Sequence, residues 1–266
     1  MFSHDGNHLV VWESPIKNNL QVYQLVFDKE GIQDIQLKHQ YSPYESTKGL
    51  GLRNLQMAPN KQFALGGYCD GRLRLINALT WREVFAFNHA ANFDELDDNN
   101  SPPDLNIYVE SESVEDGPLY EAVSKPFKIE KITHPTASQV QRDTDLPRVG
   151  VSKVAVSHDS TFVASVCEQC PLYIWIWDLE KLTLNSVIMQ KNPVDSVSWA
   201  PNSLNLNICS ADSKIFLWSL RGASVCQVPA MTQREGFKVT EIMWNQNGKN
   251  FAAVEENNGL VFVYPQ

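Results

Sequence analysis

The sequence has no long hydrophobic run and no excess of positive charge, and both absences narrow its function. No stretch approaches the roughly eighteen consecutive apolar residues of a membrane-spanning helix, and no basic segment followed by an apolar one opens the chain. The 266 residues carry 22 lysines and arginines against 31 acids, a formal net charge of -9. We therefore expect a soluble, non-secreted protein whose main partner is neither nucleic acid nor an anionic membrane.

Cysteine is scarce and indicates neither a disulfide framework nor a metal centre. The five cysteines are an odd number, and most lie in or beside apolar, β-branched stretches, which is typical of reduced thiols in the cytosol or nucleus. Cys167 and Cys170 have the spacing of a redox pair or of half a zinc site. Because no second pair completes four ligands, we expect a turn between two strands at this place.

The usual signatures of catalysis and cofactor binding are also missing. The six histidines form no His-x-x-x-His pair, and no glycine-rich phosphate loop of standard spacing is present. Ser157-His158-Asp159 has the residue types of a catalytic triad, but the same residues recur at Ser3-His4-Asp5 in a predicted turn. Three consecutive residues cannot adopt the geometry of nucleophile, base and orienting acid. We therefore expect a non-enzyme without metal or cofactor.

The sequence does contain one pattern that recurs five times. In each copy an apolar strand ends in a turn rich in Pro, Asp and Asn, a strand with small residues follows, and a second turn leads to an alternating strand. The first turns contain Asp5, Asn60, Asp159, Asn202 and Asn247. Asp159 and Asn202 are 43 residues apart, and Asn202 and Asn247 are 45 apart. This period is typical of a four-stranded propeller blade, which takes roughly 40 to 45 residues.

Several other positions recur within the units and are expected to be structural. Asp70-Gly71 and Asn258-Gly259 have the composition of a tight hairpin between the second and third strands. The third strands end in an aromatic or polar residue. The positions that we expect to be structural are Asp5, Tyr23, Asn60, Asp70, Asn77, Asp159, Trp177, Asp178, Asn202, Trp218 and Tyr264.

The tryptophans divide into two groups by their place in the repeat. Large side chains at matching strand positions are expected to pack between sheets. These positions hold Trp177, Trp199, Trp218 and Trp244. Trp81 follows a third strand, and Trp175 is expected to face away from Trp177, so we take Trp81 and Trp175 as candidate surface anchors.

Trp177-Asp178 is a literal WD pair and Trp218-Ser219 is a common variant at the same position, and the chain thereby resembles the WD40-repeat family. No Gly-His pair opens any unit, so complete Asp-His-Ser-Trp networks are not expected. The resemblance implies an all-β, WD40-type β-propeller with about five blade units and a rigid surface for binding proteins.

An insertion interrupts the repeat between the second and third units. Asn60 and Asp159 are 99 residues apart, which is a blade and a further segment of similar length. We place blades at residues 1–91 and 150–266 and an acidic, partly disordered insertion at residues 92–149. Ten acids precede Lys125 in this insertion, and without them the net charge of -9 becomes +1. Residues 92–104 are predicted to be a solvated loop. Residues 105–109 and 126–132 are candidate strands that would extend or complete a blade.

The first unit is incomplete. Phe2 aligns with the last residue of the first strand in the other units, which is Met57, Val156, Trp199 or Met243. Propellers have about four to eight blades, and the usual closure pairs an N-terminal strand with the last blade. We therefore expect the chain to form the C-terminal part of a larger propeller.

Three stretches, residues 2–23, 65–81 and 174–219, resemble the C-terminal half of the centrosomal and spindle-pole WD-repeat proteins of the Wdr-eight type. That resemblance implies a cytoplasmic, cytoskeletal adaptor at the spindle pole body or centrosome. It would bind a coiled-coil anchoring protein and a kinesin-14 motor and so anchor microtubule minus ends. Contact with microtubules would be indirect, because tubulin's surface and the insertion are both acidic.

Other functions stay open on the sequence. One is a WD-propeller translation-initiation factor that binds ribosomal components, and another is a general WD40 protein-interaction scaffold. A ubiquitin-ligase substrate receptor is disfavoured, because Glu180 stands where such proteins carry Arg. An acidic loop would either dock a basic partner segment or simply keep the insertion soluble. The candidate protein-binding residues are Trp81, Asp94, Glu95, Asp97, Asp98, Glu112 and Glu115.

Overall fold

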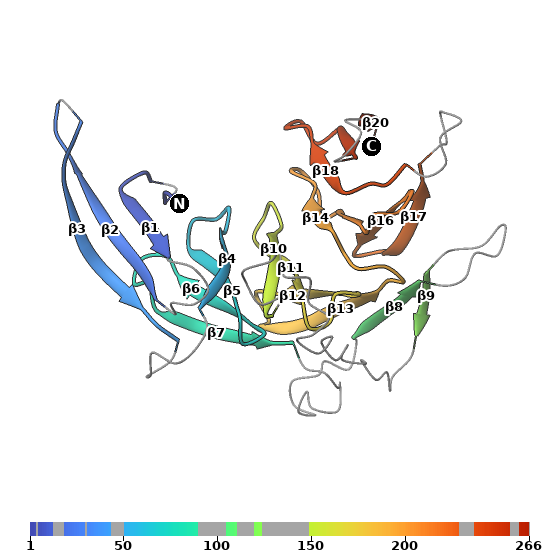
Figure 1. Ribbon diagram of the computed structural model, residues 1–266, viewed down its shortest axis with the longest axis horizontal. Coiled ribbons are helices and arrows are strands. Elements are labelled where there is room, and N and C mark those ends of the chain that lie inside the picture. Colours follow the sequence, from blue (N-terminus) through green and yellow to red (C-terminus); the bar gives the residue numbers. More distant parts are fainter. Residues whose placement is uncertain are drawn as a thin grey trace, which may run out of the picture. The chain divides into compact units, whose positions relative to one another are not determined.

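A computed structural model describes ten segments of the chain (Figure 1). They are residues 1–3, 5–12, 19–29, 31–43, 51–89, 105–110, 120–123, 149–228, 237–255 and 261–265. These segments are all-β, as predicted, and none of them contains a helix that could cross a membrane. The chain forms two compact units, residues 1–89 with 133–154 and residues 90–132 with 155–266.

The strands are arranged in five sheets, and most neighbouring strands are antiparallel. The first sheet contains β1 (His8–Trp12), β2 (Leu20–Phe27) and β3 (Ile32–Tyr41), and the second contains β4 (Leu52–Met57), β5 (Phe63–Tyr68), β6 (Arg72–Asn77) and β7 (Glu83–Asn88). The third contains β10 (Val151–Val156), β11 (Phe162–Cys167), β12 (Tyr173–Asp178), β13 (Thr183–Met189), β8 (Asn106–Glu110) and β9 (Tyr120–Val123). The fourth contains β14 (Ser196–Trp199), β15 (Leu206–Cys209), β16 (Lys214–Ser219) and β17 (Gly222–Gln227), and the fifth β18 (Glu241–Trp244), β19 (Asn250–Val254) and β20 (Val261–Pro265).

The second and fourth sheets are complete four-stranded meanders, as the repeat predicts. Equivalent cross-strand pairs recur in them and in the third sheet: Leu65 faces Leu75, Ala164 faces Ile176, and Asn207 faces Leu217. The period-2 alternation of each strand therefore places equivalent residues on equivalent faces. The repeat identified in the sequence is a repeat of strand pairing.

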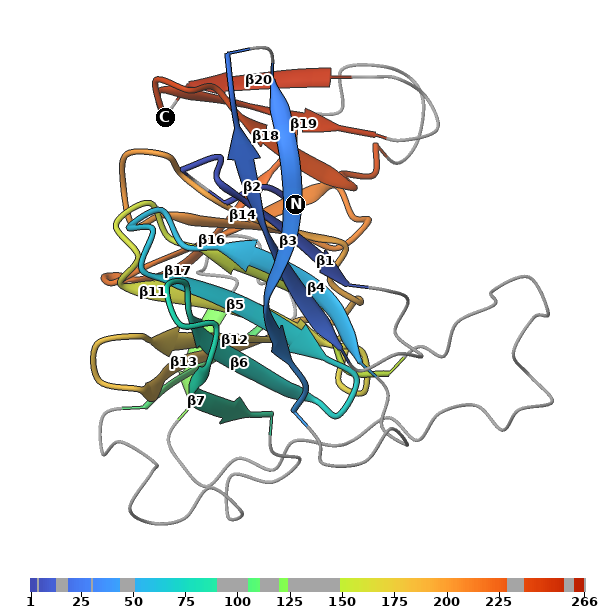
Figure 2. The ribbon, with the colours of Figure 1, turned by 90° about the vertical axis from the view of Figure 1, so that its left-hand side faces the viewer.

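Within the described residues, the first sheet has three strands, one fewer than the second and fourth sheets. Figure 2 shows β1, β2 and β3 side by side. Phe2 forms an isolated antiparallel bridge with Leu9, which agrees with its alignment to the end of a first strand. Membership of a larger propeller stays a prediction.

The insertion contributes two strands to the third sheet. β8 pairs in parallel with the outer strand β13, with Asn106 opposite Ser186, and β9 pairs antiparallel with β8. The prediction of a blade-extending strand at residues 105–109 is thus confirmed by β8. The predicted loop at residues 92–104 and the predicted strand at residues 126–132 lie outside the described residues.

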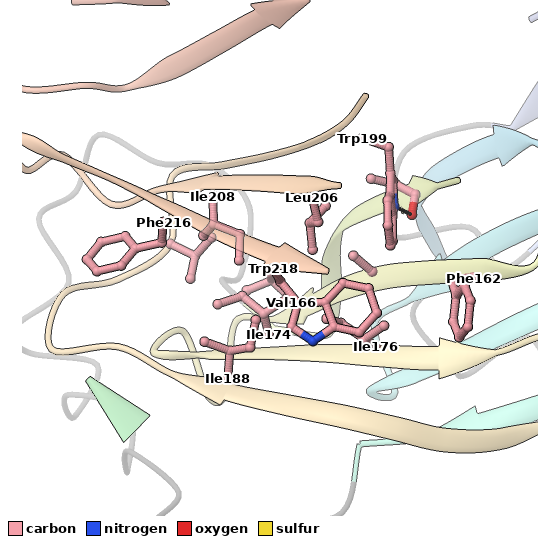
Figure 3. Close-up of a cluster of buried hydrophobic side chains, with 13 residues drawn as sticks. Phe162, Val166, Ile174, Ile176, Ile188, Trp199, Leu206, Ile208, Phe216 and Trp218 are labelled. Atoms are coloured by element: carbon pink, nitrogen blue, oxygen red, sulfur yellow. Dashed lines mark hydrogen bonds between the residues drawn. The ribbon is translucent and has the colours of Figure 1, made fainter. Parts of the chain in front are cut away.

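In the second unit, the apolar core lies between the third and fourth sheets (Figure 3). Ile174 and Ile176 on one sheet meet Ile208, Phe216 and Trp218 on the other, and all five are at most 2% exposed. Because β12 has sheet neighbours on both sides and apolar residues on both faces, its YIWIWD segment is buried throughout.

Two tryptophans also join the first strands of successive sheets in this unit. The Trp199 ring packs edge to face on Trp218 at 5.8 Å between centroids. Its Nε1–H donates a hydrogen bond of 2.8 Å to the carbonyl oxygen of Ala155. Trp244 repeats the bond one sheet later, donating to the carbonyl oxygen of Ser198 at 3.3 Å. These tryptophans pack between sheets, as their matching positions predict.

We expect Ile208→Ala to destabilise the protein by about 3 kcal/mol, because it removes buried methyl groups from closely packed sheets and leaves a cavity. Ile208 is 0% exposed. The matched control is Leu79→Ala, since Leu79 is 82% exposed and its truncation should cost less than about 0.5 kcal/mol. Urea unfolding followed by tryptophan fluorescence measures both. Equal losses of stability in the two variants would contradict the packing described above.

Candidate protein-binding surface

The recurring acids and amides of the first turns cap those turns from their side chains. An Oδ1 atom accepts a hydrogen bond from the backbone N–H two residues later at Asp5 (3.0 Å), Asn60 (3.0 Å) and Asp159 (3.1 Å). Such turns favour Asp and Asn for this reason. Asn202 differs, because its Nδ2 donates to the carbonyl oxygen of Asn247 at 2.6 Å and links the turns of the fourth and fifth sheets.

The residues that end the third strands cap the next turn in the same way. Asn77 Oδ1 accepts from the backbone N–H groups of Leu79 and Thr80, both at 2.9 Å. Asp178 Oδ1 accepts from those of Glu180 and Lys181 at 3.0 and 2.9 Å. The Asp of the WD pair is therefore a turn cap, as is the Asn that replaces it in the second sheet.

Three further predicted positions have simpler partners. Trp177 Nε1–H donates to Ser165 Oγ at 2.9 Å, which is a partial form of the blade network. The Tyr23 hydroxyl donates to Gln21 Oε1 at 2.9 Å. Tyr264 lies in β20 opposite Phe251, and its side chain is outside the described residues.

Ser157, His158 and Asp159 form a turn and not a catalytic constellation. The Ser157 hydroxyl donates directly to Asp159 Oδ1 at 2.7 Å and accepts from the backbone N–H of Phe162 at 2.9 Å. Burial by itself raises the pKa of Asp159, but the hydrogen bonds from Ser157 and Thr161 outweigh it and the pKa is lowered. The Ser157 hydroxyl thus donates its hydrogen bond to a carboxylate and not to a histidine, and His158 is exposed, so these three residues lack the arrangement in which a base activates a serine.

The cysteine pair also belongs to a turn. Cys167 and Cys170 are both buried, and the backbone N–H of Cys170 donates to the carbonyl oxygen of Cys167 at 2.9 Å. Among the residues that the structure describes, no three His, Cys, Asp or Glu side chains cluster as metal ligands would.

Burial raises the pKa of Cys209 to about 12, so this thiol is protonated at neutral pH.

Both candidate surface tryptophans are buried, and the prediction that they are anchors is wrong. Trp81 is 2% exposed and packs in the core of the first unit with Val10, Val22 and Leu55. Trp175 is 0% exposed and stacks on Trp177 at 5.8 Å. Residues two apart on a strand share a face, so Trp175 and Trp177 lie side by side instead of pointing in opposite directions.

Asp70 belongs to a buried ionic network in the first unit that the sequence did not reveal. Arg74, 3% exposed, makes a bidentate contact with Asp70 at 2.6 and 3.0 Å and a bond to Glu83 at 3.2 Å. Its guanidinium lies 4.5 Å from the centre of the Tyr68 ring. The Tyr41 hydroxyl donates to Glu83 and thereby ties β3 to β7. A buried arginine needs such partners, and Glu83, which also accepts from Tyr41, joins this network of the second sheet to the first sheet.

His89 closes the same end of the second sheet. Its ring is buried, and Nδ1–H donates to the carbonyl oxygen of Gly71 at 2.7 Å. Burial lowers the pKa of His89 from 6.5 to about 4, although the Gly71 carbonyl and the Asp70 carboxylate act in the opposite direction. The histidine is therefore neutral in the folded protein at physiological pH.

Glu110, a described residue of the acidic segment, is ion-paired and hydrogen-bonded within the fold. Its side chain is 4% exposed and its Oε1 lies 3.1 Å from Lys214 Nζ. Its Oε2 accepts from the backbone N–H of Lys191 at 2.9 Å. Glu110 therefore fixes β8 to the fourth sheet and to the end of β13, and is not available to a partner. Residues Asp94, Glu95, Asp97, Asp98, Glu112 and Glu115 lie outside the described residues, and their docking role stays a prediction.

The buried His89 makes stability depend on pH. Between about pH 6.5 and pH 4 the unfolded chain binds a proton that the folded chain does not, so the free energy of unfolding falls as the pH falls through this window. The loss should reach about 3 kcal/mol by pH 4. In His89→Asn, an amide N–H can still face Gly71 and this part of the slope should disappear. His158→Asn, at an exposed histidine, should keep it. Urea titrations at several pH values measure the slopes, and equal slopes in wild type and His89→Asn would refute the assignment.

The ion pair between Glu110 and Lys214 predicts that the negative charge of Glu110 stabilises the position of β8. Glu110→Gln should lower the free energy of unfolding by about 1 to 3 kcal/mol, because it weakens a buried charge-assisted hydrogen bond. Amide hydrogen exchange in residues 106–110 should become faster. The double variant with Lys214→Met should lose less than the sum of the single variants, by at least about 0.5 kcal/mol. Glu241→Gln, at an exposed acid, is the control. Additive losses would show that Glu110 and Lys214 do not interact.

No family model matches the sequence, but two curated proteins do. WD repeat-containing protein WRAP73 of Mus musculus is 30% identical over 279 aligned residues, covering 96% of this chain and 54% of the relative. An uncharacterized WD repeat-containing protein of Schizosaccharomyces pombe is 24% identical over 262 residues, covering 92% of this chain and 47% of the relative. The chain spans about half the length of these relatives. The repeated sheets and their turn caps, together with these two similarities, identify the fold as a WD40-type β-propeller.

Proposed function

We propose that the chain is a non-enzymatic protein-interaction scaffold of the WD40 type. The observation that carries this proposal is how the described polar residues are used. Asp5, Asn77 and Asp178 cap turns, and Arg74 and Glu110 are ion-paired inside the fold. Polar side chains that stabilise turns and sheets are typical of a rigid scaffold, and the loops and exposed faces of such a scaffold bind other proteins. Both relatives are named as WD repeat proteins, which agrees with that role.

We propose more specifically that this scaffold works as an adaptor at the spindle pole body or centrosome. The support is the resemblance of residues 2–23, 65–81 and 174–219 to the Wdr-eight type of WD-repeat protein. On this proposal the chain binds a coiled-coil anchoring protein and a kinesin-14 motor, and microtubule minus ends are held indirectly through them. The net charge of -9 favours such an indirect link, because an acidic protein and acidic tubulin repel each other.

The test is to tag the gene at its own locus, purify the protein gently from dividing cells and identify the proteins that accompany it by mass spectrometry. We expect a coiled-coil anchoring protein and a kinesin-14 motor. Ribosomal subunits and initiation factors in their place would favour a translation-initiation factor and refute the adaptor. Recovery of no partner at all would refute the scaffold.

The same purification tests the acidic docking segment. A variant with Asp94, Asp97 and Asp98 changed to Asn and Glu95 changed to Gln removes four negative charges without altering the described strands. If the segment docks a basic partner, recovery of that partner should fall, and more so at low salt. Asp28→Asn with Asp34→Asn, at exposed positions of the first sheet, is the control for loss of charge alone. Unchanged recovery would mean that the insertion serves solubility.

A further inference from the structure

A pocket of about 380 Å³ opens in the second unit between the fourth and fifth sheets. Leu217, Ser224 and Cys226 of the fourth sheet form one side, and Trp244 and Phe251 of the fifth sheet form the other. The two aromatic rings lie 5.1 Å apart, tilted by 60°. No charged side chain is among the described residues of the wall. A space of this size and composition suits an uncharged, largely apolar group.

Among the described residues, two side chains in the wall of this pocket have buried polar atoms without a hydrogen-bond partner, the amide of Asn207 and the indole N–H of Trp218. Asn207 is 0% exposed, and neither its Nδ2 nor its Oδ1 has a hydrogen-bond partner. A carboxamide that loses water without gaining a partner costs free energy, and buried groups of this kind call for an explanation. The Ser219 hydroxyl, which also borders the pocket, is partnered: it donates to the carbonyl oxygen of Gly222 and accepts from the backbone N–H of Arg221.

The fold itself does not require an amide at this position. Asn207 faces Leu217 across the strand pair of the fourth sheet, as Ala164 faces Ile176 in the third and Leu65 faces Leu75 in the second. Ala164 and Leu65 are both fully buried. An apolar side chain therefore fills the same place in two other sheets, and the asparagine is the exception that lies against a pocket.

We propose that this pocket is a binding site for an uncharged peptide segment of a partner protein. An apolar side chain enters between Leu217 and the Trp244 and Phe251 rings, and the Asn207 amide turns toward the segment and pairs with one of its amide groups. The choice of a peptide as occupant rests on the proposed scaffold function. Two features favour an uncharged peptide at this site. A carboxamide offers one donor group and one acceptor, which match the C=O and N–H of a peptide unit. The described wall carries no charge, so a charged ligand would lose its hydration without gaining a partner.

The probe for this site is N-acetyl-leucine N-methylamide, which carries an apolar side chain between two amides and no charge. Titration into the ¹⁵N-labelled protein, followed by the side-chain amide of Asn207 and the indole N–H of Trp244, should give saturable shifts. N-acetyl-leucine, whose free carboxylate is charged, should bind at least about tenfold more weakly, which corresponds to about 1.4 kcal/mol.

Two variants separate recognition from folding. Asn207→Leu replaces the amide by an apolar group of similar size, so we expect a fold that is at least as stable as wild type and a loss of probe binding of about tenfold or more. Gln62→Leu removes an amide at an exposed position of the other unit and should leave binding unchanged. Thermal unfolding of each variant shows whether it is folded.

The outcomes that would overturn the site are distinct from those that would overturn the scaffold. Equal binding of the probe to Asn207→Leu and wild type, or no shift at the highest soluble concentration, would refute the pocket as an amide site. An Asn207 amide that exchanges magnetisation with water and ignores the probe would show that the pocket is merely hydrated. If Asn207→Leu still recovers every partner from cells, the scaffold stands and uses another surface, whereas a wild-type protein without partners refutes the scaffold whatever the probe does.

Discussion

Packing of one sheet face against the next is the interaction on which the described structure depends. A three- or four-stranded antiparallel sheet cannot bury both of its faces alone, so each sheet needs a neighbour. Between the third and fourth sheets this need is met by isoleucines, Phe216 and Trp218, and in the first unit by Val10, Val22, Leu55 and Trp81. The turns and the ionic contacts keep each strand in the register that this packing requires.

The polar residues that first attract attention serve this architecture. Ser157 and Asp159 bond to each other and to the backbone of their own turn, and Asp178 caps the turn after the WD pair. Each of these side chains replaces a hydrogen bond that a tight turn leaves unmade. A scaffold built in this way can vary its loops and exposed faces with little cost to its core, which is the basis for a role in protein binding.

The insertion and the pocket show two ways in which a repeated fold becomes specific. β8 enters the third sheet as an added parallel strand and is fixed by Glu110 to Lys214, so an acidic segment is held against a blade by one buried carboxylate. At the pocket, Asn207 breaks a pattern that Ala164 and Leu65 keep. In both places the structure departs from the repeat, through an added strand in the third sheet and through an amide in place of an apolar side chain in the fourth.

The sequence by itself determined the all-β class, the blade period and the turn positions, because strand alternation and turn chemistry act over a few neighbouring residues and recur in each unit. It also located β8 within the insertion. Only the tertiary structure decided which side chains are buried between sheets: Trp81 and Trp175 lie in the interior, and Arg74 gathers Asp70, Glu83 and Tyr68 around it. The unpartnered amide of Asn207 was equally out of reach. The physical reason is that burial, ion pairing and an unmade hydrogen bond depend on what the next sheet places opposite a residue, and no local pattern records that.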